Sequence, residues 1–302
     1  MQLFQDNNFF ILLAVFSIPA LIMGYFEKPL RIYGFAVSLV FLWLVMGGTH
    51  RALVYLAVFL LWEIVEAKIY LKVREKYGRN RKLYYLFLIL SLLPLILNKY
   101  DHATGGVLHW FGFLGISYMT FKSAQVIIQI FDGQIKEVES FPYVYMMIFF
   151  PVITSGPIDR SVRFRDDMYR VIPRQEYMDM AGQGLFKIVL GVVYKVVIAA
   201  GFYQLEIRLG HGLDLKGALI YMYTYGFYLF FDFAGYSLMA VGASYLFGIK
   251  TPDNFNKPFI SVDMKDFWDR WHITLSHWFR DFVFSRVTMN LIRSRKIKSH
   301  QA

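Results

Sequence analysis

The run WDRWHITLSHWFRDFVF at residues 268–284 holds the side chains best suited to chemistry in this 302-residue sequence. It contains two histidines, His272 and His277, among tryptophans, arginines and aspartates. An imidazole has an ordinary pKa of about 6.5, so it exchanges protons near neutral pH and suits a general acid or base. The sequence has no cysteine, which excludes thiolate catalysis and cysteine metal sites.

A single helix over 268–284, with about 100° between successive residues, places the two histidines on different faces. One face is an apolar stripe of Trp268, Trp271, Leu275, Phe279 and Phe282. The opposite face is polar and carries Arg270, Thr274, His277 and Asp281. The pattern predicts that His272, at the edge of the stripe, points inward, as a general acid or base or as a packed structural histidine. Histidines five positions apart diverge by about 140°, so we expect no metal site here.

Long uncharged runs indicate that the chain crosses a membrane several times. Residues 9–26, 32–48 and 83–98 carry no charge, and about 17–25 apolar residues are needed for a helix to cross a bilayer. Only 18% of the residues are charged, against about 25% in soluble domains. The runs do not alternate as barrel strands do. The sequence therefore predicts an all-α polytopic membrane protein, whose run at 9–26 is a membrane helix rather than a signal peptide.

We expect helices at 8–26, 31–48, 51–72, 82–98, 107–131, 142–155, 184–207 and 217–248. The segment 107–131 fits a short or re-entrant pair, because Lys122 and Gln125 interrupt it. The segment 142–155 is predicted to be broken or tilted, because it contains two prolines. Between the predicted segments 142–155 and 184–207, residues 156–183 read as a polar surface loop with a helix near 174–183. Residues 249–266 are predicted to form a turn-rich loop.

Several ionisable residues lie inside apolar segments, where each must face a cavity or a partner. For Glu63, Lys187 and Lys195 we favour helix pairing or a side chain that reaches the membrane surface. Asp232 is short and central in its segment. We expect Asp232 to be buried and hydrogen-bonded, with a structural role. The alternative is a transporter or lipid-moving scaffold in which Asp232 marks a permeation path.

The net charge of +10 is concentrated in two basic segments, 68–82 and 286–298. Cytoplasmic loops of membrane proteins collect Lys and Arg, so both segments are predicted to lie on the cytosolic side. This explanation comes before nucleic-acid binding, which we do not expect.

Four stretches, in order, resemble the signatures of the membrane-bound O-acyltransferase family. They are FFPVITSGPIDR (149–160), FYLFFDFAGYSLMAVGASYLFG (227–248), TPDNFNKPF (251–259) and DFWDRWHITLSHWFRDFVF (266–284). The stretch at 112–138 resembles the branch that serves D-alanylation of teichoic acid in Gram-positive bacteria, rather than the branch that O-acetylates alginate. The resemblance covers nearly the whole chain.

This resemblance implies a ring of membrane helices around a central tunnel, with short helices at 261–302 on the cytosolic side. A D-alanyl carrier protein would present D-alanine as a phosphopantetheine thioester, with no cofactor bound to the chain itself. The other membrane proteins of the teichoic acid D-alanylation system would be further partners in the lipid bilayer. His272 matches the first signature histidine and is the candidate catalytic residue. Asp232, Asp269 and Ser276 are candidate polar residues of the tunnel or of the supporting structure.

The family's second signature histidine lies in a GLWHG-like segment several tens of residues later, which has no counterpart before Ala302. The resemblance therefore implies a C-terminally truncated chain with that histidine beyond Ala302. We expect residues 1–302 to form one incomplete membrane domain, with about eight or more membrane helices or re-entrant segments, and to be inactive alone. The alternatives are an O-acetyltransferase for an exported polysaccharide and a non-catalytic membrane scaffold.

The region after residue 282 predicts a docking surface for the carrier. The surface consists of Val283, Arg286, Val287, Leu291 and Arg293. Its apolar members are four residues apart, and acyl carrier proteins are acidic with a small apolar patch, as the resemblance implies. Apolar anchors ringed by complementary charge suit a transient docking site. The same composition also suits a helix that lies in an anionic lipid interface.

Overall fold

The computed structural model describes residues 1–48, 50–105, 112–209 and 214–295, with only the backbone for the last three. The chain divides into two compact units. Unit 1 consists of Met1–Leu53, Ile148–Pro157 and Arg163–Asp253, and unit 2 consists of Val54–Met147, Ile158–Val162 and Asn254–Ala302. All regular secondary structure in the described residues is helical, which confirms the predicted all-α class.

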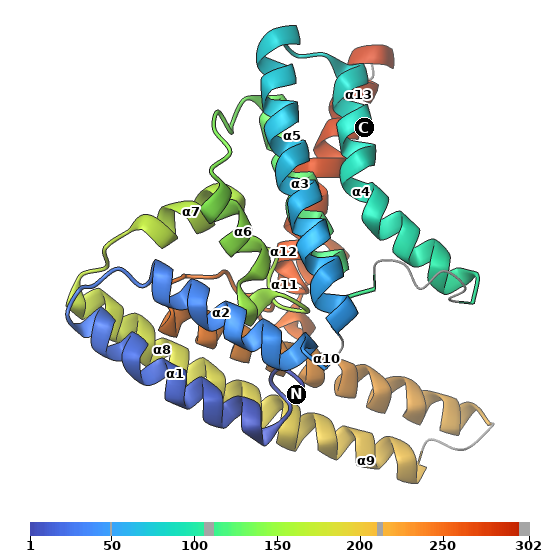
Figure 1. Ribbon diagram of the computed structural model, residues 1–302. Coiled ribbons are helices and arrows are strands. Elements are labelled where there is room, and N and C mark those ends of the chain that lie inside the picture. The colour runs from blue at the N-terminus through green and yellow to red at the C-terminus, as the bar shows by residue number, and fades with distance from the viewer. Residues whose placement is uncertain (49, 106–111, 210–213, 296–302) are drawn as a thin grey trace. The chain divides into compact units, whose positions relative to one another are not determined.

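Unit 1 is built from long apolar helices. They are α1 (Asn7–Tyr25), α2 (Arg31–Met46), α8 (Arg174–Val192), α9 (Ala200–Leu209) and α10 (Leu215–Leu246), with the 3-10 turn η1 (Phe150–Val152) and most of α7 (Ser161–Tyr169). The π-helical segment η2 (Val193–Ala199) joins α8 to α9 without a break. Helix α8 lies beside α1 and packs along α10 (Figure 1).

Glycines allow α8 and α10 to approach closely. A Cβ added at Gly242 would lie 2.4 Å from the carbonyl oxygen of Gly184, and one added at Gly235 would lie 2.7 Å from that of Gly191. A methyl group fits at neither position. Small residues at helix contacts are typical of membrane proteins, where close backbone packing replaces the hydrophobic drive of water.

Tyr177 joins three helices of unit 1. Its hydroxyl oxygen lies 3.0 Å from the carbonyl oxygen of Ala20 on α1 and 2.8 Å from that of Leu246 on α10. Its ring fills the space beside Gly24, where an added Cβ would lie 2.1 Å from a ring carbon. The residue is fully buried, so the polar sequence around 174–183 also contributes a side chain to the core.

Unit 2 contains the remaining helices. They are α3 (His50–Tyr77), whose first residues belong to unit 1, α4 (Arg81–Ala103), α5 (Ile116–Asp132), α6 (Ser140–Ile148), η3 (Pro258–Ile260), α11 (Met264–Arg270), α12 (Ile273–Phe279), the π-helical η4 (Arg280–Phe284) and α13 (Ser285–Arg295). Helix α4 packs along α5. The fully buried Lys122 of α5 donates a hydrogen bond to the carbonyl oxygen of Met146 on α6, at 2.9 Å.

Among the described residues, four helices are long and apolar enough to cross a membrane. They are α1, α4, the continuous run Arg174–Leu209, and α10, while α2 is a shorter apolar helix. The predicted break at 142–155 is confirmed, because α6 ends at Ile148 and only a short 3-10 turn follows. The predicted division between a helix at 174–183 and one at 184–207 is wrong. The segment has no proline or charged cluster in its middle, so the helix continues through it.

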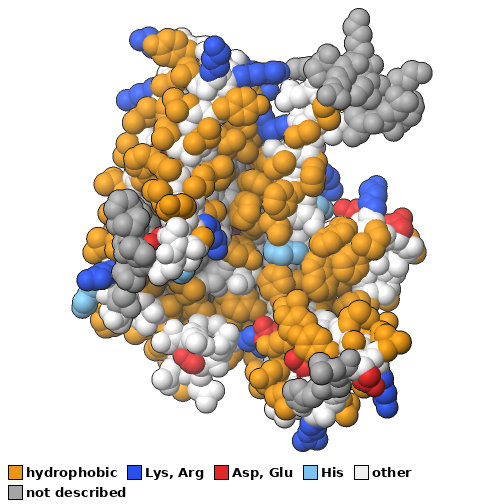
Figure 2. Space-filling view, turned by 90° about the vertical axis from the view of Figure 1, so that its right-hand side faces the viewer, with side chains coloured by type: hydrophobic (Ala, Val, Ile, Leu, Met, Phe, Trp, Pro, Cys, Tyr) orange, Lys and Arg blue, Asp and Glu red, His pale blue; other side chains and the backbone are white. Residues whose placement is uncertain are grey.

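The predicted re-entrant pair at 107–131 is described only in part. Residues 106–111 lie outside the described residues, and α5 covers the remainder as one helix. Apolar side chains cover much of the face in Figure 2, and Lys and Arg side chains lie mostly around its edges. Helix α1 alone exposes more than half of Ile11, Ile18 and Ile22. Such a surface requires a lipid environment, because soluble monomers seldom expose continuous apolar patches larger than a few hundred Å².

We predict that the ends of α3 and α13 share the cytosolic side. The chain lacks cysteine, so a thiol reagent would label only a cysteine introduced in place of the exposed Lys72 or Asn290. Both should react with a membrane-impermeant maleimide only after intact cells are permeabilised, because basic segments stay in the cytosol. Labelling of either cysteine in intact cells would overturn this topology.

Candidate functional site

His272 occupies a break between two short helices. Helix α11 ends at Arg270, and α12 begins at Ile273. His272 has φ 44° and ψ 51°, in the left-handed region that side chains with a Cβ seldom adopt. Its carbonyl oxygen accepts hydrogen bonds from the N–H groups of Leu275 and Ser276, both at 3.0 Å. The histidine is therefore the N-cap residue of a new helix rather than a member of a continuous one.

Two other segments of unit 2 hold this turn in place. Asn254 accepts from the backbone N–H of Ile273 at 2.9 Å through its carbonyl oxygen, and from the Thr274 hydroxyl at 2.5 Å through Oδ1. The backbone N–H of Ile158 donates to the same Thr274 hydroxyl oxygen at 3.0 Å. Asn254 and Thr274 are both buried. These bonds fix both sides of His272, because Asn256 N–H also donates to the Arg270 carbonyl oxygen at 3.0 Å.

The prediction of one helix over 268–284 is therefore wrong, and so are the faces derived from it. Thr274, predicted to be solvated, is 6% exposed, whereas Trp268, predicted to point inward, is 53% exposed. His272 and His277 are both half-buried. The break at His272 rotates the second half of the segment relative to the first. A helical wheel assumes constant rotation and cannot represent this change.

Burial disfavours the protonated form of both imidazoles. It lowers the pKa of His272 to about 4. It also lowers the pKa of His277, with the positive charge of Arg280 as a second cause. Both rings are therefore mainly neutral near pH 7, and a neutral ring can accept a proton. His272 is the more strongly shifted of the two, which sets it apart from an ordinary surface histidine.

The polar residues predicted near His272 support the helices. Ser276 donates from its hydroxyl to the Trp271 carbonyl oxygen at 3.2 Å, across the break. Asp269 lies 3.8 Å from Arg280. Ser276 thus joins α12 to the C-cap residue of α11, and Asp269 joins α11 to η4. The structure therefore places Ser276 and Asp269 in the framework of the turn.

Ion pairs extend this framework to the segment before α7. Asp281 accepts from Arg160 at 2.7 Å and from Arg280 at 3.2 Å. The Arg160 guanidinium also lies 4.5 Å from the centre of the Phe282 ring. Sequence reasoning missed the roles of Asn254, Thr274 and Ile158. Only the two asparagines of the 251–259 stretch gave a signal, as turn-forming residues.

Asp232 belongs to unit 1, on α10. It forms an ion pair with Lys195 of the π-helical segment η2. The side chain of Asp232 is 35% exposed and that of Lys195 is 12% exposed. The expected hydrogen bond is confirmed, but the expected full burial is wrong, because the pair lies where the helix surface is only partly covered. Lys187 is likewise paired, with Asp253 at 2.7 and 2.9 Å, but this partner lies in the loop after α10 rather than on a neighbouring helix.

The predicted docking residues do not form one uniform face. Val283, Arg286 and Val287 line a cavity of about 580 Å³ within unit 2. Arg286 forms an ion pair with Asp132, so its charge is partly neutralised. Val287 remains 51% exposed. Leu291 is half-buried, and the side chain of Arg293 lies outside the described residues.

Comparison with known proteins identifies one family and two groups of relatives. Residues 133–302 match the membrane-bound O-acyltransferase family. The teichoic acid D-alanyltransferase of Bacillus subtilis is 38% identical over 97% of this chain and 77% of its own length. The protein of the same name from Streptococcus thermophilus is 41% identical over 96% of this chain and 72% of its own length.

The second group of relatives matches less of the chain. The probable alginate O-acetylase AlgI of Pseudomonas aeruginosa is 33% identical over 57% of this chain and 33% of its own length. Two kinds of acyl-transfer protein are thus similar to the chain, and the D-alanyltransferases are similar over nearly all of it.

We predict that the His272 site makes the protein less stable in mild acid. The unfolded histidine takes up a proton near its ordinary pKa of about 6.5, whereas folded His272 does so only near pH 4. The unfolded state therefore binds more protons between these values, and the apparent melting temperature in detergent should fall across this range. His272→Asn should reduce the fall by at least about 2 °C. Asparagine tolerates the left-handed conformation, so an unchanged pH dependence would contradict the low pKa.

We also predict that Asp232→Asn lowers stability before it affects chemistry. Loss of the carboxylate leaves the poorly exposed Lys195 cation without its partner. Because the pair is partly exposed, we expect a cost of about 1–3 kcal/mol, between the values for surface and buried pairs. The double variant Asp232→Asn, Lys195→Met should recover most of the melting temperature. A stable but inactive single variant would instead assign Asp232 a direct part in the reaction.

Proposed function

The chain belongs to the membrane-bound O-acyltransferase family, and we propose that it transfers D-alanine from a carrier-protein thioester for D-alanylation of teichoic acid. It is a multi-pass membrane protein of an acyltransferase family, with four long apolar helices among its described residues. The D-alanyl group and teichoic acid enter the proposal from the names of relatives that match nearly the whole chain.

The observation that carries the proposal is the convergence of three signature stretches on one histidine. Ile158 of GPIDR, Asn254 of TPDNFNKPF and Thr274 of the WHITLS run meet in one set of hydrogen bonds. These residues are distant in sequence, and their bonds fix the turn that carries His272. A positioned, partly buried imidazole is what a proton transfer at an acyl group needs.

The reaction requires the protein to position the acceptor hydroxyl and the thioester, to exclude water and to transfer one proton. A hydroxyl oxygen of the acceptor attacks the carbonyl carbon of the D-alanyl thioester, so that a C–O bond forms and the C–S bond breaks. The hydroxyl proton passes to the neutral imidazole of His272 and then to the departing thiolate sulfur. The products are a D-alanyl ester and the free thiol of phosphopantetheine, which the carrier supplies.

The low pKa of His272 suits a short-lived role in this step. An imidazole of pKa about 4 holds a proton weakly, so it cannot deprotonate a free hydroxyl to completion. The hydroxyl becomes acidic only as its oxygen bonds to the carbonyl carbon. Because the imidazolium is strongly acidic, it then returns the proton to sulfur readily.

The carrier docking surface remains part of this proposal. Val287 is 51% exposed, and the neighbouring Phe284 and Met289 are 62% and 53% exposed. These apolar side chains suit the small apolar patch of an acyl carrier protein. Arginines beside them would raise the association rate with an acidic carrier.

We predict that membranes containing the protein transfer radiolabelled D-alanine from its carrier thioester into teichoic acid. His272→Asn should lower the rate by about 10²–10⁴-fold, the usual contribution of a general acid–base group. His277→Asn is the matched control and should retain nearly the wild-type rate. Transfer that is equal in the two variants, or that proceeds only from an acetyl donor, would overturn the proposal.

The carrier surface is tested separately by binding. Val287→Asp should abolish retention of the carrier in a pull-down, because a carboxylate would face the acidic, apolar patch of the partner. Val262→Asp is the matched control, since Val262 is 89% exposed in the loop before α11. Carrier retained at the wild-type level by the Val287 variant would exclude this docking surface.

A further inference from the structure

We infer that the pocket between the start of α4 and α12–α13 is a binding site for an anionic phospholipid. This inference does not depend on the proposed reaction. The pocket has a volume of about 580 Å³ and lies wholly within unit 2. Such a volume falls within the roughly 300–1,000 Å³ of small-molecule sites. Its lining differs between its two sides, and that difference specifies the ligand.

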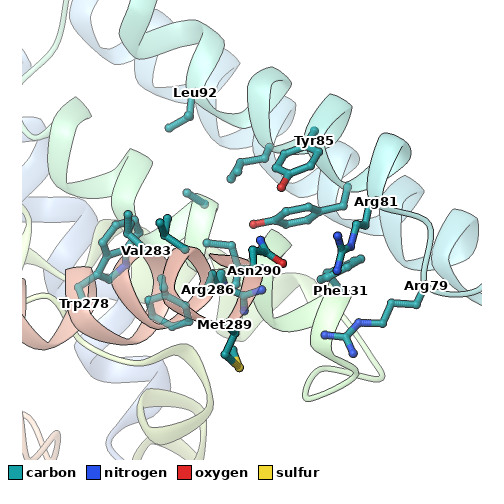
Figure 3. A pocket seen from close by; sticks show the side chains of 16 residues that line it. Arg79, Arg81, Tyr85, Leu92, Phe131, Trp278, Val283, Arg286, Met289 and Asn290 are labelled. Atoms are coloured by element: carbon teal, nitrogen blue, oxygen red, sulfur yellow. The ribbon is translucent and has the colours of Figure 1, made fainter. Parts of the chain in front are cut away.

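One side of the pocket is cationic. Arg79, Arg81 and Arg286 line it, and Figure 3 shows Arg79 and Arg81 on the same side, with Arg286 between them and the apolar wall. Asp132 pairs with Arg79 at 3.2 Å and also with Arg286. The single carboxylate leaves an excess of two positive charges. Arg81 forms no ion pair with any described residue.

The other side of the pocket is apolar. Leu88 and Leu92 of α4 line it, together with Ile128 of α5 and Val283. Figure 3 shows Leu92, Trp278 and Val283 on the side away from Arg79 and Arg81. This wall contributes no charged group, so it suits a hydrocarbon chain.

The direction of the pocket matches the direction of a lipid in a bilayer. Helix α4 is one of the four candidate spans and begins at Arg81. At 1.5 Å per residue, Leu88 and Leu92 lie roughly 10 and 16 Å along the helix from Arg81. The cationic side is therefore at the charged end of the span, and the apolar wall extends towards the bilayer core. A phosphate at the membrane surface with an acyl chain along α4 satisfies both ends.

Two of the buried side-chain donors that lack a hydrogen-bond partner among the described residues belong to the lining. They are the Nε–H of Arg286 and the indole N–H of Trp278, which is 6% exposed. A buried donor without an acceptor is costly, and lipid supplies two kinds of acceptor. The phosphate oxygens suit Arg286 through a charge-assisted bond, and an ester carbonyl suits the indole.

The same lining does not suit the phosphopantetheine arm of a carrier. That arm also bears a phosphate, but two amide groups follow the phosphate along the chain. On the side of Leu88, Leu92 and Val283, the Trp278 indole N–H can bond one amide carbonyl, but these apolar side chains offer no acceptor for the amide N–H groups. Amides buried there would lose their hydrogen bonds to water. The chemistry of the wall therefore selects hydrocarbon behind the phosphate.

The test is retention of defined lipids by the purified full chain. The protein is exchanged into mild detergent with equal amounts of phosphatidylglycerol and phosphatidylcholine of the same acyl chains, and bound lipid is measured by native mass spectrometry. We expect at least tenfold preferential retention of phosphatidylglycerol, reduced by added salt because the contact is electrostatic. Equal retention of the two lipids would overturn the inference.

Variants on the α4 side separate this site from carrier docking. The double variant Arg79→Glu, Arg81→Glu should lower phosphatidylglycerol retention about tenfold. Lys72→Glu is the control and should leave retention unchanged, because Lys72 lies near the C-terminal end of α3, outside the pocket. Leu92→Trp should fill the pocket and reduce retention without any change of charge, so it serves if the double variant fails to fold. An equal effect of Lys72→Glu, or no effect of Leu92→Trp, would contradict the site.

Two soluble competitors distinguish a lipid from other phosphate sources. Inorganic phosphate should not displace bound phosphatidylglycerol, because it lacks the acyl chain. The carrier docking surface shares Val283, Arg286 and Val287 with the pocket. The carrier with its phosphopantetheine should still not displace the lipid, because the acyl chain also contacts Leu88 and Leu92 of α4, which the docking surface does not include. Displacement by either competitor at concentrations near that of the lipid would assign the pocket to that competitor and overturn the inference.

Discussion

The hydrogen bond between the Thr274 hydroxyl and Asn254 Oδ1 is the contact from which the local structure around His272 follows. Thr274 is buried, and its oxygen also accepts from Ile158 N–H, so one side chain joins three segments of the chain. A left-handed histidine costs about 1–3 kcal/mol of backbone strain, which the surrounding bonds must offset. A continuous helix would avoid that cost, but it would remove the Ile273 N–H from the Asn254 carbonyl oxygen. The break therefore gives the Thr274 hydroxyl and the Ile273 N–H hydrogen-bond partners in distant segments.

A different constraint organises unit 1, where the helices approach through glycine. The contacts of Gly184 with Gly242, and of Gly191 with Gly235, bring the two backbones too close for any larger residue. Gly235 also packs against the backbone of Lys195, which places that cation beside Asp232 one turn away. The ion pair and the close packing are thus parts of one arrangement. The π-helical turn at η2 contributes to it, because an extra residue in the turn shifts the direction of the side chains that follow.

Hydrophobic runs predicted most of the helices, because length and apolar character are sufficient to identify a helix in a bilayer. The runs at 9–26 and 83–98 correspond to α1 and α4. Their ends differ by only one or two residues, except that α4 continues beyond the run to Ala103. The sequence did not predict the break at His272, because nothing between Trp268 and Phe284 resembles a helix stop. The cause lies in distant partners, Asn254 and Ile158, whose side chain and N–H complete the turn. The sequence predicted that Asp232 would be hydrogen-bonded, but it did not identify Lys195 as the partner. Spacing along the chain does not reveal which cation lies opposite a carboxylate.

Asp132 shows why an acidic residue inside a basic cluster can favour anion binding. A guanidinium carries five N–H donors, and each of Arg79 and Arg286 directs one nitrogen to Asp132. The carboxylate holds both groups in position and leaves donors on each that point elsewhere. The Arg79 guanidinium is further fixed against the Phe131 ring, 4.8 Å from its centre. Binding to such a preorganised pair costs less side-chain entropy than binding to free arginines, while the net charge of the cluster stays positive. Because Arg81 has no such partner among the described residues, it remains available to follow the position of the bound phosphate.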